Sequence, residues 1–270
     1  MGKIFDALEK SKKEKTRRPA EEAGRPSGQK KIQGKKKKID RNLVTLLSPR
    51  SFASEQFKQL RTSLLFPKSG VSPRTIMVTS AAPSEGKSFV AANLALSIAQ
   101  NINEHVLLID CDMRNPCVHT MFGFSRVPGL ADYLTNGTPL ASVLLKSPVE
   151  KLSILPVGEP PDNPAELLSS EKMSDLLKEV KTRYNDRYII VDLPPPNFTA
   201  EANALARQVD GILLVIQYGG TRREMIEDLI ASVGKEKILG VVFNQFDERI
   251  SDHYGYKKYN KYLADYAGHV

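Results

Sequence analysis

The sequence predicts a doubly wound α/β fold, in which a mostly parallel β-sheet is covered by helices on both faces. Short apolar segments alternate along the chain with longer segments whose apolar residues recur at helical spacing. The short segments are continuous runs, mostly of β-branched residues and leucine, as in strands buried on both faces. A loop that contains glycine, lysine and serine follows the first of these strands, where such folds bind phosphate groups.

The first half of the fold is expected to begin with a helix over residues 51–66, because Ser51 or Ser54 can cap its N-terminus. Residues 75–79 (TIMVT) form the first expected strand, and residues 106–109 (VLLI) form the second. Residues 87–100 lie between them and are expected to form a helix. This order is typical of parallel strands joined through a helix.

The second half continues the alternation of strands and helices. Its strands are again short apolar runs, such as YIIV at residues 188–191 and ILLVI at residues 212–216. The other expected elements are strands at residues 152–156 and 238–243 and helices at residues 170–183, 200–208 and 222–233. Ligands of such sheets bind beyond the carboxyl ends of the strands, so functional residues are expected there.

The positive charge of the chain is concentrated at its start. The 270 residues carry a net charge of +8, and residues 1–40 alone hold 14 basic and 6 acidic residues, which leaves 25 of each in the remainder. We therefore expect a basic arm at residues 1–41, a neutral domain at residues 42–250 and a tail at residues 251–270. The arm is either a solubilising linker or a contact for anionic lipid headgroups, which vesicle pelleting without residues 1–40 would test. Nucleic-acid binding is not expected, because the domain itself is not basic.

Several features predict a cytoplasmic protein. No run of about 18 apolar residues is present, and the N-terminus lacks the apolar core of a signal peptide. Cys111 and Cys117 are the two cysteines, and they are expected to be reduced thiols because their number and spacing do not suggest a disulfide framework.

Residues 80–88 (SAAPSEGKS) resemble a phosphate-binding loop. Gly86 lets the backbone approach a phosphate, Lys87 supplies a positive charge, and the Ser88 hydroxyl can bind Mg²⁺. The sequence departs from the general pattern at Ala81, where the first glycine is usual; the alternative is a structural turn. The residues expected to contact the nucleotide are Ala82, Pro83, Ser84, Glu85, Gly86, Lys87, Ser88 and Phe89.

Three aspartates follow two of the expected strands. Asp110 and Asp112 come after VLLI, and in an extended chain residues two apart point to the same side. Asp192 follows YIIV, where phosphate-loop nucleotidases place an acid of the Mg²⁺ site. One carboxylate can bind the metal while another accepts a proton from an attacking hydroxyl. Helix caps after buried strands are the alternative interpretation.

Tyrosines are clustered at the end of the chain. Five of the nine tyrosines lie within its last 17 residues, namely Tyr254, Tyr256, Tyr259, Tyr262 and Tyr266. They would suit either the apolar side of a packed helix or a flexible tail that accepts phosphate.

Taken together, these motifs resemble the bacterial tyrosine kinases (BY-kinases) of polysaccharide export. The three nucleotide motifs of the family match residues 81–88, 107–116 and 189–195, and its N-P-x-E-L-L segment matches residues 163–168. The helix motif E-x-x-R-x-x-R that packs subunits into a ring matches Glu55, Lys58 and Arg61, with lysine in place of the first arginine. The first ten residues are similar to those of autokinases from exopolysaccharide loci associated with exosortases.

The resemblance implies an ATP-dependent tyrosine autokinase. ATP with Mg²⁺ would bind the loop, with Asn244 near the base and with Ser88, Asp112 and Asp192 around the metal. Lys87 would stabilise the transferred phosphoryl group and Asp110 would be the base. The tail tyrosines would be phosphorylated in trans, and the added charge would loosen the ring.

The family also implies partners. One is a membrane chain-length regulator with an activating cytosolic tail, and the other is a cognate phosphotyrosine phosphatase. The membrane partner implies that the protein works at the inner face of the membrane. Two alternatives stay open: a positioning ATPase like ParA and MinD, and a nucleotide-gated scaffold without phosphotransfer. The loop lacks the additional lysine that marks the ParA and MinD loops.

Overall fold

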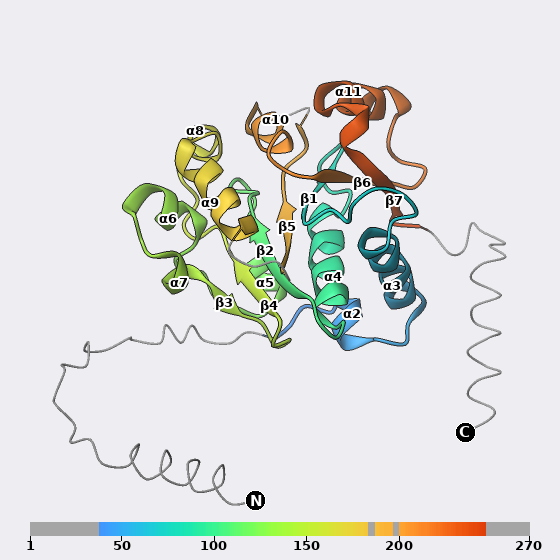
Figure 1. Ribbon diagram of the computed structural model, residues 1–270, viewed down its shortest axis with the longest axis horizontal. Helices are drawn as coiled ribbons and strands as arrows, with labels where there is room; N and C mark the ends of the chain where they lie inside the picture. The colour runs from blue at the N-terminus through green and yellow to red at the C-terminus, as the bar shows by residue number, and fades with distance from the viewer. Residues whose placement is uncertain (1–37, 183–186, 197–199, 247–270) are drawn as a thin grey trace, which may run out of the picture. The chain divides into compact units, whose positions relative to one another are not determined.

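The computed structural model describes residues 38–182, 187–196 and 200–246, all of which belong to one compact unit. In this part of the chain, seven strands form one sheet with the order β3-β4-β2-β5-β1-β6-β7 (Figure 1). All neighbouring pairs are parallel except β3 and β4. The strands are β1 (Thr75–Ser80), β2 (His105–Asp110), β3 (Leu145–Lys146), β4 (Leu152–Leu155), β5 (Arg187–Asp192), β6 (Gly211–Gln217) and β7 (Ile238–Asn244).

Helices cover both faces of this sheet. Hydrophobic contacts join one face to α2 (Val44–Leu47), α3 (Phe52–Leu65), α4 (Lys87–Ala99) and α5 (Val118–Met121). The other face is packed against α6 (Leu130–Asn136), α7 (Leu140–Val143), α8 (Pro164–Leu168), α9 (Glu171–Thr182), α10 (Ala200–Ala206) and α11 (Arg223–Val233). A 3₁₀ turn at Lys235–Lys237 precedes β7. The predicted doubly wound α/β fold is confirmed.

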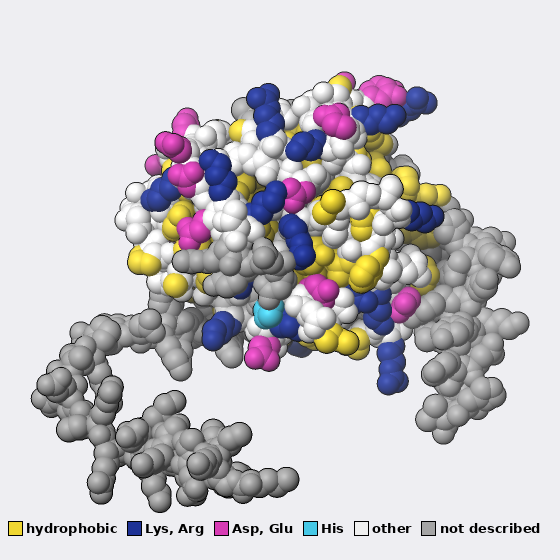
Figure 2. All heavy atoms as spheres, in the orientation of Figure 1, with side chains coloured by type: hydrophobic (Ala, Val, Ile, Leu, Met, Phe, Trp, Pro, Cys, Tyr) yellow, Lys and Arg dark blue, Asp and Glu magenta, His cyan; other side chains and the backbone are white. Residues whose placement is uncertain are grey.

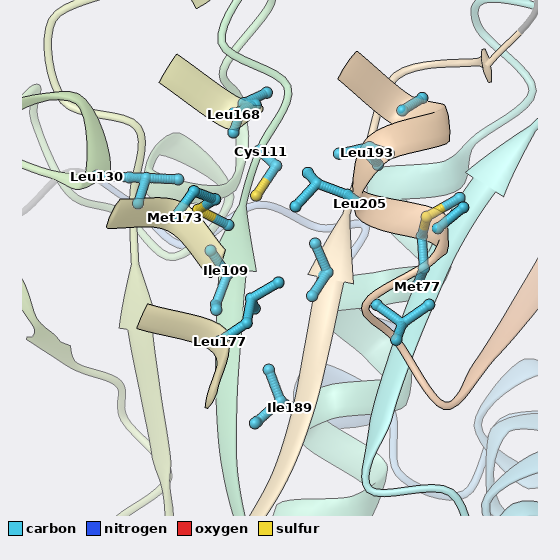
Figure 3. Packing of buried hydrophobic residues seen from close by; sticks show 14 of the residues in the cluster. Met77, Ile109, Cys111, Leu130, Leu168, Met173, Leu177, Ile189, Leu193 and Leu205 are labelled. Atoms are coloured by element: carbon cyan, nitrogen blue, oxygen red, sulfur yellow. The ribbon is translucent and has the colours of Figure 1, made fainter. Parts of the chain in front are cut away.

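The two hydrophobic cores arise from the alternation of side chains along each strand. In β1, Ile76 and Val78 are buried with α3 and α4, whereas Met77 is buried on the opposite face with α9 and α10. Figure 3 shows Leu177 of α9 beside Ile109 of β2 in that second core. Burial from both sides fixes the strands, and therefore the loops at their carboxyl ends have a rigid base.

Every helix and strand predicted from the sequence is present, with ends that differ by at most two residues. The cap of α3 is Ser51, whose hydroxyl oxygen accepts a hydrogen bond of 3.2 Å from the N–H of Ser54. The Ser54 hydroxyl instead donates to the carbonyl of Ser48, at 2.7 Å. Both cysteines are free thiols, as predicted.

The expectation that all strands are buried on both faces is wrong for β7. Side chains of this strand remain exposed at Leu239 (39%), Val241 (44%) and Phe243 (65%). The three exposed side chains alternate along β7 and therefore lie on one face of this end strand, which the described helices leave uncovered there. Its apolar sequence therefore does not by itself indicate full burial.

The surface of the described domain carries charged side chains of both signs (Figure 2). Figure 2 shows Lys, Arg, Asp and Glu side chains interspersed over the face in view. None of the helices in the described ranges is long and apolar enough to cross a membrane. Most of the basic arm (residues 1–37) and all five tail tyrosines (Tyr254, Tyr256, Tyr259, Tyr262 and Tyr266) lie outside the described residues.

Candidate nucleotide site

The candidate site lies at the carboxyl ends of β1, β2 and β5, which are neighbours in the sheet. The loop between β1 and α4 ends at Gly86, the N-cap residue of α4, which has a left-handed conformation with φ of +88°. Helix α4 therefore begins at Lys87, and its first N–H groups have no partners within the helix. Such a helix start, with its positive dipole end, favours the binding of phosphate oxygens.

Glycine is favoured at position 86 by a close contact with Asn244 as well as by the left-handed backbone conformation. A Cβ atom added at this position would lie 2.1 Å from Nδ2 of Asn244, which is far inside van der Waals distance. The same Nδ2 donates a 2.8 Å hydrogen bond to the Glu85 carbonyl. The end of β7 thus rests directly on the loop. A Cβ atom at position 86 would force the Asn244 side chain to move and to give up its hydrogen bond to Glu85.

Replacing Gly86 with alanine is expected to weaken nucleotide binding by at least about fivefold, since strain of about 1–3 kcal/mol would displace the loop. Titration with a fluorescent nucleotide measures this. Gly70→Ala is the matched control, because Gly70 has a similar φ of +82° but no atom within 4 Å of the added Cβ. Equal affinity of Gly86→Ala and wild type would refute the assigned role of the contact.

Lys87 and Asp112 form the central ion pair of the site. Nζ of Lys87 lies 2.6 Å from Oδ2 of Asp112, and the two side chains are only 14% and 6% exposed. Nζ also lies 3.4 Å from the Ser88 hydroxyl. Burial lowers the pKa of Lys87, but the attraction of Asp192 and Asp112 outweighs it and raises the pKa above its ordinary value. Lys87 is therefore positively charged at neutral pH.

Asp110 is fully buried and bonded to the backbone. Its Oδ1 accepts a 3.1 Å hydrogen bond from the N–H of Asp112, and its Oδ2 accepts one of 3.2 Å from the N–H of Val118. Burial, together with the repulsion of Asp192 opposite it in the β2–β5 register, raises the pKa of Asp110 well above its ordinary value. Its hydrogen bonds hold the chain segment that carries Asp112.

Asp192 is buried without a partner. Its side chain has no exposed surface, and neither carboxylate oxygen makes a hydrogen bond with the described residues. Burial raises the pKa of Asp192 to about 6, although the charge of Lys87 and the nearby Ser88 hydroxyl, which lies outside good hydrogen-bond geometry, both oppose this rise. A buried carboxylate without hydrogen bonds is costly, and this is the arrangement expected where a bound cation is to be accommodated.

The residues present fit a Mg²⁺ ion that is bound together with phosphate. The Ser88 hydroxyl and the carboxylates of Asp112 and Asp192 supply the hard oxygen ligands that Mg²⁺ prefers. Within the described ranges, no three His, Cys, Asp or Glu side chains are placed to hold a metal alone. The ion would therefore depend on phosphate oxygens and water for its remaining ligands, as is usual for Mg²⁺.

Not all the residues expected at the site face it. The Phe89 ring packs edge-to-face on Phe57, with centroids 5.7 Å apart, so only its backbone is available to a phosphate. The Glu85 side chain is 2% exposed and is turned into the protein.

The predicted oligomer contact lies elsewhere, on α3. Lys58 there pairs with Glu55 at 3.0 Å, while Arg61 donates to the Ser97 carbonyl at 2.9 Å. A ring contact through these three residues stays a prediction.

The sequence-based reasoning missed three residues that hold the loop, namely Gln217, Thr221 and Gln245. Gln245 donates to the Ser84 carbonyl at 2.7 Å, and Thr221 donates to the Glu85 carboxylate. The sequence gives little sign of this role. The segment YGGT at residues 218–221 indicates only a turn after a strand.

Comparison with known proteins decides the family. Residues 76–268 match the family model described as the CobQ/CobB/MinD/ParA nucleotide binding domain. The chain is also 38% identical over 224 residues to tyrosine-protein kinase YwqD of Bacillus subtilis, which covers 81% of this chain and 92% of that one. The chain belongs to the bacterial tyrosine kinase family.

Two further members of the bacterial tyrosine kinase family support this assignment. Tyrosine-protein kinase wzc of Salmonella typhimurium is 32% identical over 239 residues, or 88% of this chain, and the chain spans 32% of that longer kinase. The kinase domain of Escherichia coli tyrosine kinase ETK has a TM-score of 0.72 and 30% identity, over 81% of this chain and 85% of that one. The resemblance drawn from the motifs is confirmed.

Proposed function

We propose that the protein binds ATP with Mg²⁺ at residues 81–88 and transfers the γ-phosphoryl group to tyrosines of its C-terminal tail. The observation that carries this proposal is the pairing of Lys87 with Asp112 beside the partnerless Asp192, at the start of α4. The ammonium group of Lys87, a helix N-terminus and buried carboxylates are groups of the kind that phosphoryl transfer requires. Membership of a family of tyrosine-protein kinases supports tyrosine as the acceptor.

In the proposed mechanism, the loop N–H groups bind the phosphate oxygens and Lys87 turns from Asp112 toward the β- and γ-phosphates. Ser88, Asp112 and Asp192 would hold Mg²⁺, which when bound neutralises charge on the phosphates. Asn244 would lie near the adenine base. These residues fix the orientation of the phosphoryl group, which is the main contribution a protein makes to this reaction.

Asp110 is the proposed base toward the tyrosine hydroxyl. Its raised pKa brings it closer to the range in which a carboxylate accepts a proton effectively at neutral pH. Because Asp110 has no exposed surface, the segment after β2 would have to open before a tyrosine could reach it.

We propose that transfer occurs between subunits of a ring, with Glu55, Lys58 and Arg61 at the contact. The acceptors would be Tyr254, Tyr256, Tyr259, Tyr262 and Tyr266. Added phosphates would repel one another and loosen the ring, and a phosphatase would reverse this. By resemblance to the BY-kinases, the cycle would regulate exopolysaccharide polymerisation and export together with an activating membrane chain-length regulator.

Mapping of phosphate by mass spectrometry tests this proposal. Full-length protein co-expressed with the cytosolic segment of the membrane partner is expected to carry phosphate on the tail tyrosines. A variant with all five tyrosines replaced by phenylalanine should keep ATP binding but lose that phosphate. Mixing this variant with the site-inactive Lys87→Met protein should place phosphate on the Lys87→Met tail, because only transfer between subunits can do so.

A positioning ATPase is the second candidate, favoured by the match to a family model that includes MinD and ParA. It predicts ATP hydrolysis stimulated by lipid or DNA and an unmodified tail in every sample. That combination of results would replace the kinase proposal. Binding of ATP without hydrolysis or transfer would instead indicate a nucleotide-gated scaffold.

A further inference from the structure

The side chain of Glu85 lies in the middle of the phosphate-binding loop but faces away from any ligand. It is 2% exposed, and its Oε2 accepts a 2.9 Å hydrogen bond from the N–H of Ala82. Its Oε1 accepts a hydrogen bond from the Thr221 hydroxyl. We infer that Glu85 and Thr221 are positioning residues that hold the loop in its nucleotide-binding shape. This inference rests on the proposed binding of ATP.

The hydrogen bond to Ala82 closes the loop on itself. Ala82 and Glu85 are three residues apart, and the carboxylate replaces the partner that the Ala82 N–H would otherwise need from water or from the backbone. A buried carboxylate is tolerated only when its oxygens are bonded. The second oxygen therefore needs a donor from outside the loop. The Thr221 hydroxyl is the nearer donor, and the N–H of Gln217 makes a longer contact of 3.5 Å with the same oxygen.

Thr221 lies in the turn that connects β6 to α11. Its hydroxyl oxygen accepts a 3.1 Å hydrogen bond from the N–H of Gln217, the last residue of β6, so the turn folds around the hydroxyl group. Gly219 takes a left-handed φ of +69° within this turn. Because β6 pairs directly with β1, the carboxyl end of β6 is a fixed point beside the loop.

A second attachment comes from the end of β7. Ser84 and Gln245 have positive φ angles of +65° and +55°, and no other non-glycine residue in the described ranges has a positive φ. The side chain of Gln245 donates to the carbonyl of Ser84 at 2.7 Å. The loop thus keeps an unfavourable backbone conformation at Ser84 because neighbouring strand ends hold it there. Loss of the Glu85–Thr221 contact would remove one of these two attachments.

The expected consequence concerns affinity for the triphosphate. Loop N–H groups bind phosphate only when they point at it together, and a loop that samples other shapes binds more weakly. Thr221→Val keeps the size of the side chain but removes the hydroxyl group. We expect it to raise the dissociation constant for a nucleotide about tenfold, the effect of losing one hydrogen bond to a charged group. Thr221→Ser, which keeps the hydroxyl, should stay within about twofold of wild type.

The experiment measures binding of a non-hydrolysable ATP analogue with Mg²⁺ to the full-length chain by calorimetry, well below the melting temperature. The variants are Thr221→Val, Thr221→Ser, Glu85→Leu and the double variant E85L/T221V. Glu85→Leu should bind more weakly than Thr221→Val, and the double variant should bind no more weakly than Glu85→Leu. Thr182→Val is the control, since that exposed hydroxyl bonds the Lys178 carbonyl on α9.

Each outcome decides a separate point. Wild-type affinity in Thr221→Val would overturn the inference, as would a Thr221→Ser protein that binds as weakly as Thr221→Val. A role in general stability alone would lower the melting temperature of Thr221→Val and leave its affinity unchanged. If the wild-type chain itself did not bind the analogue, the proposed function would be wrong, and the inference that rests on it would be wrong as well.

Discussion

Replacing Lys87 with methionine is expected to lower tyrosine phosphorylation of the tail by about 10²–10³-fold, the cost of removing a charge-stabilising donor from a phosphoryl-transfer site. Methionine keeps the length and apolar stem of the side chain, so the loop retains its packing. What is removed is the ammonium group that lies 2.6 Å from Asp112 and that is buried enough for its charge to be poorly screened. Initial rates with radiolabelled ATP measure the effect.

Lys178→Met is the control for this experiment. Lys178 also pairs with an aspartate, Asp175, but at 3.4 Å and with 71% of its side chain exposed, so its removal should not change the rate. A Lys87→Met protein that is folded and phosphorylates its tail at the wild-type rate would exclude this site as the catalytic centre.

Asp192→Asn is expected to change stability and activity in opposite directions. The variant should lose transfer activity, because a proposed Mg²⁺ ligand is gone. In the nucleotide-free state at pH 8 it should be more stable than wild type by about 1–3 kcal/mol, since the cost of burying this charge exceeds its attraction to Lys87. Thermal unfolding at a series of pH values measures this difference.

The pH dependence follows from the raised pKa of Asp192. The carboxyl group has a pKa of about 6 in the folded protein and an ordinary value of 3.8. Between these values Asp192 is more protonated in the folded state than in the unfolded state, so its contribution to stability falls as the pH rises from about 4 to about 6. The advantage of Asp192→Asn should therefore be absent near pH 4 and complete above pH 7.

Asp175→Asn controls for the loss of a charge alone, because Asp175 is 64% exposed and should give no comparable pH-dependent gain. A constant stability difference between Asp192→Asn and wild type from pH 4 to pH 8 would contradict the buried-charge explanation. ATP with Mg²⁺ should raise the melting temperature of wild type more than that of the variant.

The strands were predictable because their burial on two faces requires an apolar residue at nearly every position, and this signal is local. Short helices such as α6 and α8 were not predicted, since they owe their stability to the packing of residues such as Leu130 and Leu168 in the core. The exposure of Phe243 could not be predicted either, because it depends on which face of β7 the described helices leave uncovered.

The charged residues of the candidate site could be predicted from the sequence, but the residues that support its loop could not. Lys87 begins α4, Asp112 follows β2 and Asp192 ends β5, and the topology of a parallel sheet brings such positions together. The contact of Thr221 with Glu85 joins residues 136 positions apart, and neither residue belongs to a pattern that indicates the other. Residues that support a loop from a distant strand leave no local signal in a single sequence.

The position of Asn244 and Gln245 has a consequence for how far each tail tyrosine can travel. Both residues contact the phosphate-binding loop, so the last described residues of the chain lie beside the nucleotide site. Tyr254 follows Gln245 by nine residues and Tyr266 by 21. A fully extended chain allows these tyrosines to move at most about 30 Å and about 70 Å from that point. Each tyrosine thus has its own maximum distance from that point. Under the proposed transfer between subunits, the spacing of the subunits would decide which of the five tyrosines can reach a neighbouring active site.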